Sequence, residues 1–410
     1  MTGHRLLDAP LSTLRPDVQS LIDAVRVALG VEPPTERGPV TESLVAMASI
    51  HGVVPEMAAA SKSLGVEAQA EEPLRAVVRK EALCGLQGSA CTVRLANLMS
   101  EARIRAVIFK GVALGAQTGR SPTDRNGVDV DLLVRPQDWL EAHRVLVAAG
   151  YVPDEVRIPP VGDDSRTRFV RFTGYEAGYR GPGADTDLHW RLTPGHLRGL
   201  DTEEVIRRAV PVEVSGATVL TLDPDTALAH TVLHGAKDYW GRLRSIVDAH
   251  HLVSVAGADW DRAAALVPGS PAFAEARFGA EVLTGTEPGS EVAVGRWAPQ
   301  DQQRWLDGVD LRAQMGPGGR PPHGMARHVV RRCRLTPDPR SAAAILLNHA
   351  VTPRSLVRAG ATGSTWWLDV LAERPARAVE RMVGRSSLRG GRERGAHVVA
   401  GADAADSFEG

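Results

Sequence analysis

The chain has 410 residues, of which 43% are hydrophobic, so it is long enough for two or three globular domains and too apolar for a disordered protein. A formal net charge of −1 gives no global positive field, which favours a small-molecule, peptide or protein partner over nucleic acid. Three cysteines without metal-ligand spacing indicate reduced thiols, and neither a signal-peptide pattern nor an apolar run of about 18 residues occurs, so we expect a cytoplasmic protein without membrane contact.

Helical periodicity dominates residues 1–100, where we expect an amino-terminal helical region. Apolar residues recur at helical spacing over 15–30, and Thr41 opens a second helix that ends near His51. The segment 73–99 predicts one long helix or two shorter ones. His51 is open to two interpretations: a substrate contact, or the packing residue that a His beside a helix-ending glycine more commonly is.

An α+β core is expected over residues 101–200. The expected strands are 106–109, 128–134, 168–173 and 186–192. One helix is expected after the first strand, running to about Gly119, and another after the second strand, ending at Gly150. This order predicts a small mixed sheet.

Residues 201–383 are expected to be mostly helical. A β-hairpin is predicted around Ser215-Gly216, and Asp223 caps a long helix that continues to Val247. Further helices are predicted at 260–266, 272–283 and 342–347, and one begins at Ser364. The Arg- and Gly-rich residues 384–410 predict a disordered tail, in which a solvated role is favoured over nucleic-acid contact.

Two carboxylates stand together at the second strand. Strand side chains alternate between faces, so Asp129 and Asp131 point the same way while Val130 points into the core. Such a pair suits a hard divalent cation, Mg²⁺ or Mn²⁺, although two solvated charges at a strand end would leave the same pattern. Upstream, the turn at Lys110-Gly111 leads from a strand into a helix and offers backbone N–H groups to phosphate. Together these features indicate a site for a nucleotide and its metal.

Several motifs occur in one order along the chain. Phe109-Lys110-Gly111 is followed by Arg125, four residues before Asp129, and by the run Asp-Val-Asp-Leu-Leu-Val. In these residues the chain resembles the uncharacterised bacterial nucleotidyltransferase family, whose motifs read L-K-G and R-x-x-x-D-I-D-L-L-V. That family is similar in turn to the superfamily of DNA polymerase beta and the antibiotic nucleotidyltransferases. Further stretches that fit the family pattern are 50–53, 187–190, and 234–237 with Trp240, Leu243 and Asp248, so the resemblance covers about residues 40–260.

The resemblance implies a polymerase-beta-like core and a set of site residues. Asp187 would be the third catalytic carboxylate, holding the metal together with Asp129 and Asp131, and Asp185 on the same strand face competes for this role. His189 would border the site, or else serve as a hydrogen-bonded structural group. The residues implied to bind the nucleotide are Lys110, Gly111, Arg125 and Lys237, whereas Asp238 departs from the family, in which a His is common.

The resulting hypothesis is a metal-dependent nucleotidyltransferase. It would move a nucleoside monophosphate from a nucleoside triphosphate to an unknown acceptor and release pyrophosphate. A glycosyltransferase, which also uses Asp-x-Asp to hold a metal, is one alternative, but it explains neither Lys110-Gly111 nor Asp187. A non-catalytic nucleotide-binding member of the same fold is another. A zinc pair formed by His230 and His234 is disfavoured because no third ligand is evident.

Overall fold

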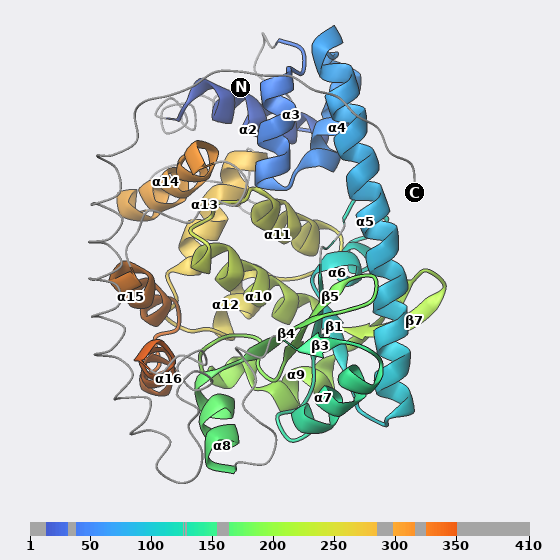
Figure 1. Cartoon of the computed structure of the whole chain (residues 1–410). Helices are drawn as coiled ribbons and strands as arrows, with labels where there is room; N and C mark the ends of the chain where they lie inside the picture. Colours follow the sequence, from blue (N-terminus) through green and yellow to red (C-terminus); the bar gives the residue numbers. More distant parts are fainter. Residues whose placement is uncertain are drawn as a thin grey trace, which may run out of the picture. The chain divides into compact units, whose positions relative to one another are not determined.

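The computed structural model describes residues 14–31, 38–125, 127, 129–153, 164–284, 298–315 and 325–350. Residues Met1–Pro353 form one compact unit, and the description below concerns its described residues. The helix expected from Ser364 and the tail expected over 384–410 lie outside the described residues. Figure 1 shows the order of the elements along the chain.

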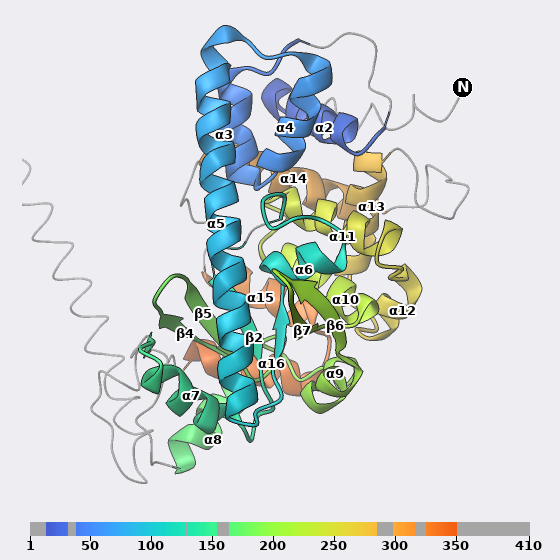
Figure 2. The same ribbon diagram turned by 90° about the vertical axis from the view of Figure 1, so that its right-hand side faces the viewer.

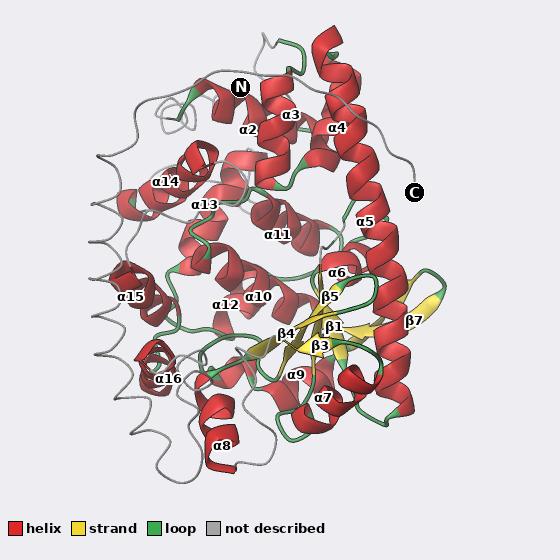
Figure 3. Ribbon diagram, viewed as in Figure 1, coloured by secondary structure: helices red, strands yellow, loops and turns green. Residues whose placement is uncertain are grey.

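A five-stranded mixed sheet forms the centre of the candidate site (Figure 3). Its strands are β1 (Val107–Phe109), β2 (Asp129–Leu133), β3 (Val152–Pro153), β4 (Glu176–Arg180) and β5 (Asp185–His189), in the spatial order β1-β2-β5-β4-β3. Strands β2 and β5 run parallel, and the other neighbouring pairs run antiparallel. The expected α+β fold with a small mixed sheet flanked by helices is confirmed.

The strand expected at 168–173 was a wrong prediction, because this segment belongs to helix α8 (Asp164–Thr173). The Thr173 hydroxyl donates to the Phe169 carbonyl one turn back, and the Gly174 N–H donates to the Val170 carbonyl at 2.7 Å. Aromatic and β-branched residues gave the segment a strand-like composition. However, its buried side chains, Val170 and Thr173, lie three positions apart, as on one face of a helix. Strand β4, which follows, was not predicted.

The amino-terminal helices are α2 (Pro16–Ala28), α3 (Glu42–His51), α4 (Val54–Leu64) and α5 (Ala68–Glu101). Thr41 caps α3 by accepting a hydrogen bond from the Leu44 N–H at 3.2 Å, and Gly52 ends it in the left-handed region at φ 68°. Helix α5 is one continuous helix of 34 residues rather than two. Figure 2 shows it running alongside α3 and α4 at one end and the sheet at the other, consistent with its contacts.

Short helices and a hairpin surround the sheet. Helices α6 (Gly111–Gln117) and α7 (Trp139–Ala148) follow β1 and β2, as predicted. After the 3-10 turn η2 (Arg198–Leu200) come α9 (Thr202–Arg208) and the antiparallel hairpin of β6 (Val210–Val214) and β7 (Ala217–Thr221). Ser215 and Gly216 have φ of 51° and 79°, the left-handed pair that a two-residue hairpin turn requires. The predicted hairpin is confirmed.

The long helix predicted from Asp223 to Val247 is two helices, α10 (Pro224–Lys237) and α11 (Arg244–Ser254). The chain breaks between them because Tyr239 and Trp240 both have positive φ, 59° and 56°, which ends a right-handed helix. The remaining helices are α12 (Trp260–Ala265), α13 (Ala272–Thr284), α14 (Pro299–Met315), α15 (Met325–Leu335) and α16 (Pro339–Ala350). Of these, α14 and α15 were not predicted.

Amino-terminal and carboxy-terminal helices pack against each other within the compact unit. Helices α13 and α14 contact α2, and α14 also contacts α3. A single large apolar cluster includes residues of these helices, of α10 and α11, and of strands β1 and β2. The region boundaries expected at 100 and 200 stay predictions. No helix in the described part of the chain combines the length and apolar composition that crossing a bilayer requires.

Candidate active site

Strands β2 and β5 bring two of the predicted carboxylates face to face. In their parallel register Asp131 is the partner of Asp187, and Asp129 is the partner of Asp185. Alternation then directs all four side chains to one face of the sheet. Val130, between Asp129 and Asp131, is buried in the core as predicted, while Asp129 itself is exposed.

Asp131 is a buried carboxylate with two partners on one oxygen. The Lys110 ammonium lies 2.5 Å from Asp131 Oδ1, and His189 Nε2 lies 3.0 Å from the same oxygen. Burial alone would raise the pKa of Asp131, but the Lys110 charge and the His189 contact hold it well below its usual range. Asp131 is therefore ionised across the physiological pH range.

Asp187 has the opposite electrostatic environment. Burial and the neighbouring carboxylate of Glu176 raise its pKa from 3.8 to about 6. Burial and the charge of Asp131 also raise the pKa of Asp129. One face of the sheet thus carries the ionised Asp131 beside Asp129 and Asp187, whose pKa values are raised. A bound cation would reduce the repulsion between these carboxylates.

The ligand atoms of Asp131, Asp187 and His189 all lie within 4.8 Å of one another. Two carboxylates so spaced fit a hard divalent cation such as Mg²⁺ or Mn²⁺. This group contains two of the three predicted metal ligands, with His189 in addition and without Asp129. A metal-binding role of Asp129 stays a prediction.

The turn between β1 and α6 has an unusual backbone. Lys110 has φ 59° and Gly111 has φ 44°, both positive, and a positive φ is uncommon for a lysine. Gly127 packs closely on this turn, since a Cβ there would lie 2.9 Å from the Asp129 carbonyl oxygen and 3.1 Å from Gly111 Cα. The loop before β2 therefore rests directly on the Lys110-Gly111 turn, which couples the two halves of the site.

Arg125 has a buried partner that the sequence did not indicate. Its Nε and Nη2 donate to the carboxylate of Asp248 on α11, at 2.9 Å to Oδ1 and 2.8 Å to Oδ2. Arg120 Nη2 also donates to Asp248 Oδ1, at 2.6 Å. Burial would raise the pKa of Asp248, but the two arginines hold it well below its usual range. Arg125 thus anchors the loop that leads to β2, and its expected contact with nucleotide stays a prediction.

A cleft of about 690 Å³ joins most of the predicted site residues. Its lining includes Lys110, Gly111, Arg125, Asp129, Asp131 and Lys237. The volume lies within the roughly 300–1,000 Å³ typical of small-molecule sites. Lys237, at the end of α10, faces the same space as Lys110, so two ammonium groups border the carboxylates from the sheet and from a helix.

The sequence pattern of the family described as "Uncharacterised nucleotidyltransferase" matches residues 40–268, more than half of the chain. The chain belongs to this nucleotidyltransferase family. The resemblance inferred from the motifs is therefore confirmed. Among curated proteins, none matches the chain.

Three solved structures show a partial likeness to this chain. The antibiotic-resistance factor ANT(2'')-Ia is 13% identical with a TM-score of 0.30, covering 42% of this chain and 84% of its own. The lincosamide antibiotic adenylyltransferase LnuA, solved with lincomycin, is 12% identical with a TM-score of 0.29, and the match covers 39% of this chain and 92% of LnuA. An antigenic nucleotidyltransferase-like protein from Paracoccidioides brasiliensis is 15% identical with a TM-score of 0.26, and the match covers 41% of this chain and 75% of that protein.

The histidines whose roles the sequence left open have separate environments in the structure. His51 is fully buried at the end of α3, which favours the packing role. His230 packs edge-on against Phe109, and burial lowers its pKa and that of His234 well below the usual value. The one group of potential metal ligands among the described residues includes neither. Asp238 is exposed, and its Oδ2 lies 3.5 Å from His234 Nδ1.

Three contributors to the site were missed from the sequence. Gly127 allows close backbone packing on the Lys110-Gly111 turn. Glu176 places a carboxylate beside His189, and Asp248 anchors Arg125. Asp248 carried a signal, since it stood among the family-like positions, but its partner was not visible. Gly127 lies between Arg125 and Asp129, where a glycine could have suggested close approach of two backbones. Glu176 carried no signal, because the strand that holds it was not predicted.

Proposed function

We propose that this protein is a metal-dependent nucleotidyltransferase that uses Mg²⁺ or Mn²⁺ to move a nucleoside monophosphate from a nucleoside triphosphate to an acceptor, with release of pyrophosphate. The observation that carries the proposal is the pairing of Asp131 with Asp187 on adjacent parallel strands, beside the Lys110-Gly111 turn. Membership of a nucleotidyltransferase family supports the class of reaction.

The metal would be held by Asp131 and Asp187. Asp129, the exposed first residue of β2, would lie beside them. When bound, the metal would neutralise phosphate charge and make the acceptor hydroxyl easier to deprotonate. The fit rests on the ligand spacing within 4.8 Å and on a carboxylate that is already ionised. His189 serves as a positioning residue, because its contact with Asp131 Oδ1 fixes the orientation of that carboxylate.

Asp187 is the proposed general base for the acceptor hydroxyl. Without metal its pKa is about 6, so the carboxyl group is ionised at neutral pH, as a base for a hydroxyl must be. Asp185, the competing residue, is exposed and belongs to no described group of metal ligands. We therefore assign the role to Asp187.

The triphosphate would lie along the cleft between Lys110 and Lys237. Both ammonium groups border that cleft, and Gly111 allows phosphate to approach the backbone of the turn. Arg125, fixed by Asp248, would contribute its positive charge from the wall of the cleft. The proposal keeps Lys110, Gly111, Arg125 and Lys237 as the nucleotide-binding set.

The acceptor is proposed to be a small molecule, a peptide or a protein rather than nucleic acid, because the chain has a net charge of −1. A cytoplasmic setting is proposed for the protein. The three cysteines of the chain, Cys84, Cys91 and Cys333, are all free thiols, which agrees with that setting.

The test is to incubate the purified protein and Mg²⁺ with each nucleoside triphosphate, labelled on the α-phosphate, together with an extract of small molecules and proteins. We expect one triphosphate to transfer label to an acceptor while pyrophosphate appears in equal amount. Nucleotide binding without transfer would instead favour the non-catalytic alternative. Transfer of sugar from a nucleotide sugar would favour a glycosyltransferase.

A further inference from the structure

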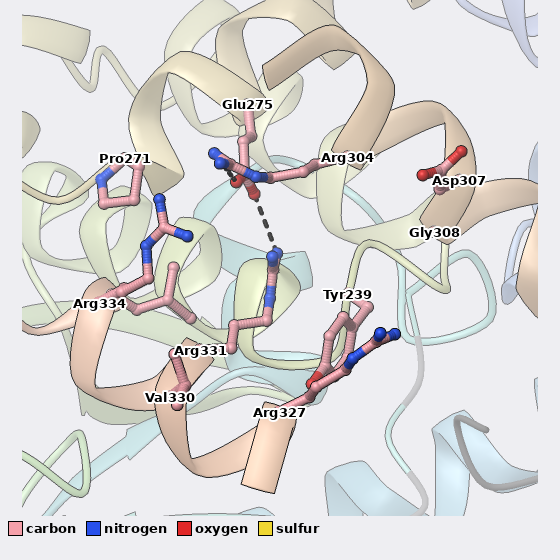
Figure 4. Close-up of a pocket in the computed structure, with 11 residues that line it drawn as sticks. Tyr239, Pro271, Glu275, Arg304, Asp307, Gly308, Arg327, Val330, Arg331 and Arg334 are labelled. Atoms are coloured by element: carbon pink, nitrogen blue, oxygen red, sulfur yellow. Dashed lines mark hydrogen bonds and ion pairs between the residues drawn. The ribbon is translucent and has the colours of Figure 1, made fainter. Parts of the chain in front are cut away.

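A second cavity, of about 500 Å³, lies among helices α13, α14 and α15 and the turn after α10 (Figure 4). It shares Tyr239 with the nucleotide cleft but contains none of the predicted site residues. Four arginines line it, Arg304, Arg327, Arg331 and Arg334, against two carboxylates, Glu275 and Asp307. The lining therefore carries an excess of positive charge in a chain whose net charge is close to zero.

Two of these arginines are fixed by one buried carboxylate. Glu275, only 1% exposed, accepts a hydrogen bond from Arg331 Nη2 at 2.9 Å, and Arg304 Nη1 lies 3.6 Å from its other oxygen. The Trp240 indole also donates to Glu275, at 2.7 Å. Arg331 Nε donates in addition to the Ala236 carbonyl at 2.6 Å. Arg304 Nη1 also donates to Asp301 Oδ1, at 2.9 Å. Glu275 and Asp301 thus hold Arg304 in place, and Glu275 holds Arg331.

Arg334 lies at the same end of the cavity. Positions 327, 331 and 334 lie on one face of α15, since they are four and three residues apart. Figure 4 shows the guanidinium of Arg334 directed toward the end of the cavity that also holds those of Arg304 and Arg331. Arg334 is exposed, and within the described ranges it has no hydrogen-bond or ion-pair partner.

Apolar side chains form another part of the cavity wall. Pro271, Val330 and Leu335 line it, and the ring of Tyr239 lies 4.7 Å from the Arg331 guanidinium carbon. A Cβ at Gly308 would overlap the carbonyl oxygen of Tyr239, so α14 and the turn are in direct backbone contact. A cationic end and apolar side chains in one preformed cavity match a small organic anion.

We propose that this cavity binds a small phosphorylated molecule, with its phosphate on Arg334, Arg304 and Arg331 and its apolar part against Val330 and Leu335. Guanidinium groups bind phosphate through paired, charge-assisted hydrogen bonds, and Arg334 lies at the same end of the cavity as Arg304 and Arg331. The proposal does not depend on the nucleotidyltransferase reaction.

The test is isothermal titration calorimetry of the full-length protein with phenyl phosphate, inorganic phosphate and benzyl alcohol. We expect saturable binding of phenyl phosphate, weaker binding of inorganic phosphate and none of benzyl alcohol. Arg334→Gln should weaken phenyl phosphate binding about tenfold or more, because it removes a charge-assisted contact. Arg79→Gln, the same change at an exposed position of α5, is the matched control and should bind as the wild type does.

A further variant separates this cavity from the nucleotide cleft. Lys237→Met alters the cleft and should leave phenyl phosphate binding unchanged. The proposal is overturned if the wild type shows no saturable binding of phenyl phosphate, if Arg334→Gln binds it as tightly as the wild type, or if Lys237→Met abolishes binding. Binding of a single-stranded oligonucleotide without binding of phenyl phosphate would also overturn it and assign the arginines to a polynucleotide.

Discussion

Asp131 and Asp187 are register partners on adjacent parallel strands, although a helix, two further strands and another helix separate them along the chain. A parallel pair needs a crossover connection, so residues distant in sequence meet at one point of the sheet. The candidate site depends on this pairing, because neither carboxylate alone gives a cation two charged ligands.

Asp131→Asn is expected to lower the rate of nucleotide transfer about a hundredfold or more while the protein stays folded, because a charged metal ligand is lost. Asp129→Asn is expected to do the same. The measurement is transfer of α-labelled nucleotide with Mg²⁺ as the only divalent cation, alongside circular dichroism. Asp124→Asn, an exposed carboxylate in the preceding loop, serves as the control. Wild-type turnover in the Asp131 variant would remove the basis of the proposed mechanism.

Asp187→Ala is expected to abolish transfer but to leave most nucleotide binding in place, because the base for the acceptor is lost while Asp129 and Asp131 remain. The matched control is Asp185→Ala, two residues earlier on the same strand, which should retain transfer. Rates of transfer and equilibrium nucleotide binding are measured for both variants. If Asp185→Ala loses transfer and Asp187→Ala does not, the assignment of the base must be exchanged.

The pKa of Asp187, raised to about 6 by burial and by Glu176, predicts two effects of pH. Binding of Mg²⁺ should weaken as pH falls below about 6, because the cation must then displace the proton of Asp187. In metal-free protein, stability should fall over the same range, since a raised folded-state pKa favours the protonated form and its contribution is lost as Asp187 ionises.

Thermal unfolding in EDTA provides the stability test. Asp187→Asn cannot ionise, so its melting temperature should exceed that of the wild type above pH 6 and match it near pH 4. An equal difference at both pH values would show that the effect of the substitution is unrelated to ionisation.

Gly127→Ala is expected to weaken nucleotide binding about tenfold, because its Cβ would press on the Asp129 carbonyl oxygen and on Gly111. Gly111→Val should have at least as large an effect. At Gly111 the reason is the positive φ, since a Cβ there would make only ordinary contacts, the nearest at 3.6 Å. Gly38→Ala, in open space, is the control. Equilibrium binding of each nucleoside triphosphate is the measurement, and unchanged binding in Gly111→Val would put the phosphates elsewhere.

Arg125→Met should destabilise the fold by ~3–5 kcal/mol, because it leaves the buried carboxylate of Asp248 with one arginine fewer. Urea unfolding of the single variants and of Arg125→Met combined with Asp248→Leu measures the pair. We expect the double variant to be less destabilised than the sum of the single variants. Additive losses would mean that the two residues do not act as a pair.

Much of the site could be predicted because its signals are local. Alternation along one strand is enough to put Asp129 and Asp131 on one face, and a glycine after a strand marks the turn at Gly111. What could not be predicted depends on contacts between distant segments. The bond between Arg125 and Asp248 and the contact of His189 with Asp131 exist only after the chain has folded.

The errors in the fold have the same origin. The aromatic and β-branched residues near Val170 favour a strand locally, but tertiary packing makes α8 a helix. The break between α10 and α11 at Tyr239 and Trp240 uses left-handed backbone without glycine, so composition gives no sign of it. The Trp240 indole bonded to Glu275 shows how distant packing stabilises that turn.

Helix α5 spans about 51 Å, since its 34 residues each rise about 1.5 Å. Its first turns bury Ala70 and Leu74, and its last turns bury Leu95 and Met99, so one hydrogen-bonded rod joins the amino-terminal helices to the sheet. Bending such a rod would break its internal hydrogen bonds. The other amino-terminal helices are therefore mechanically coupled to the sheet, and a small tilt at one end of α5 becomes a displacement at the other end, where α5 contacts β2.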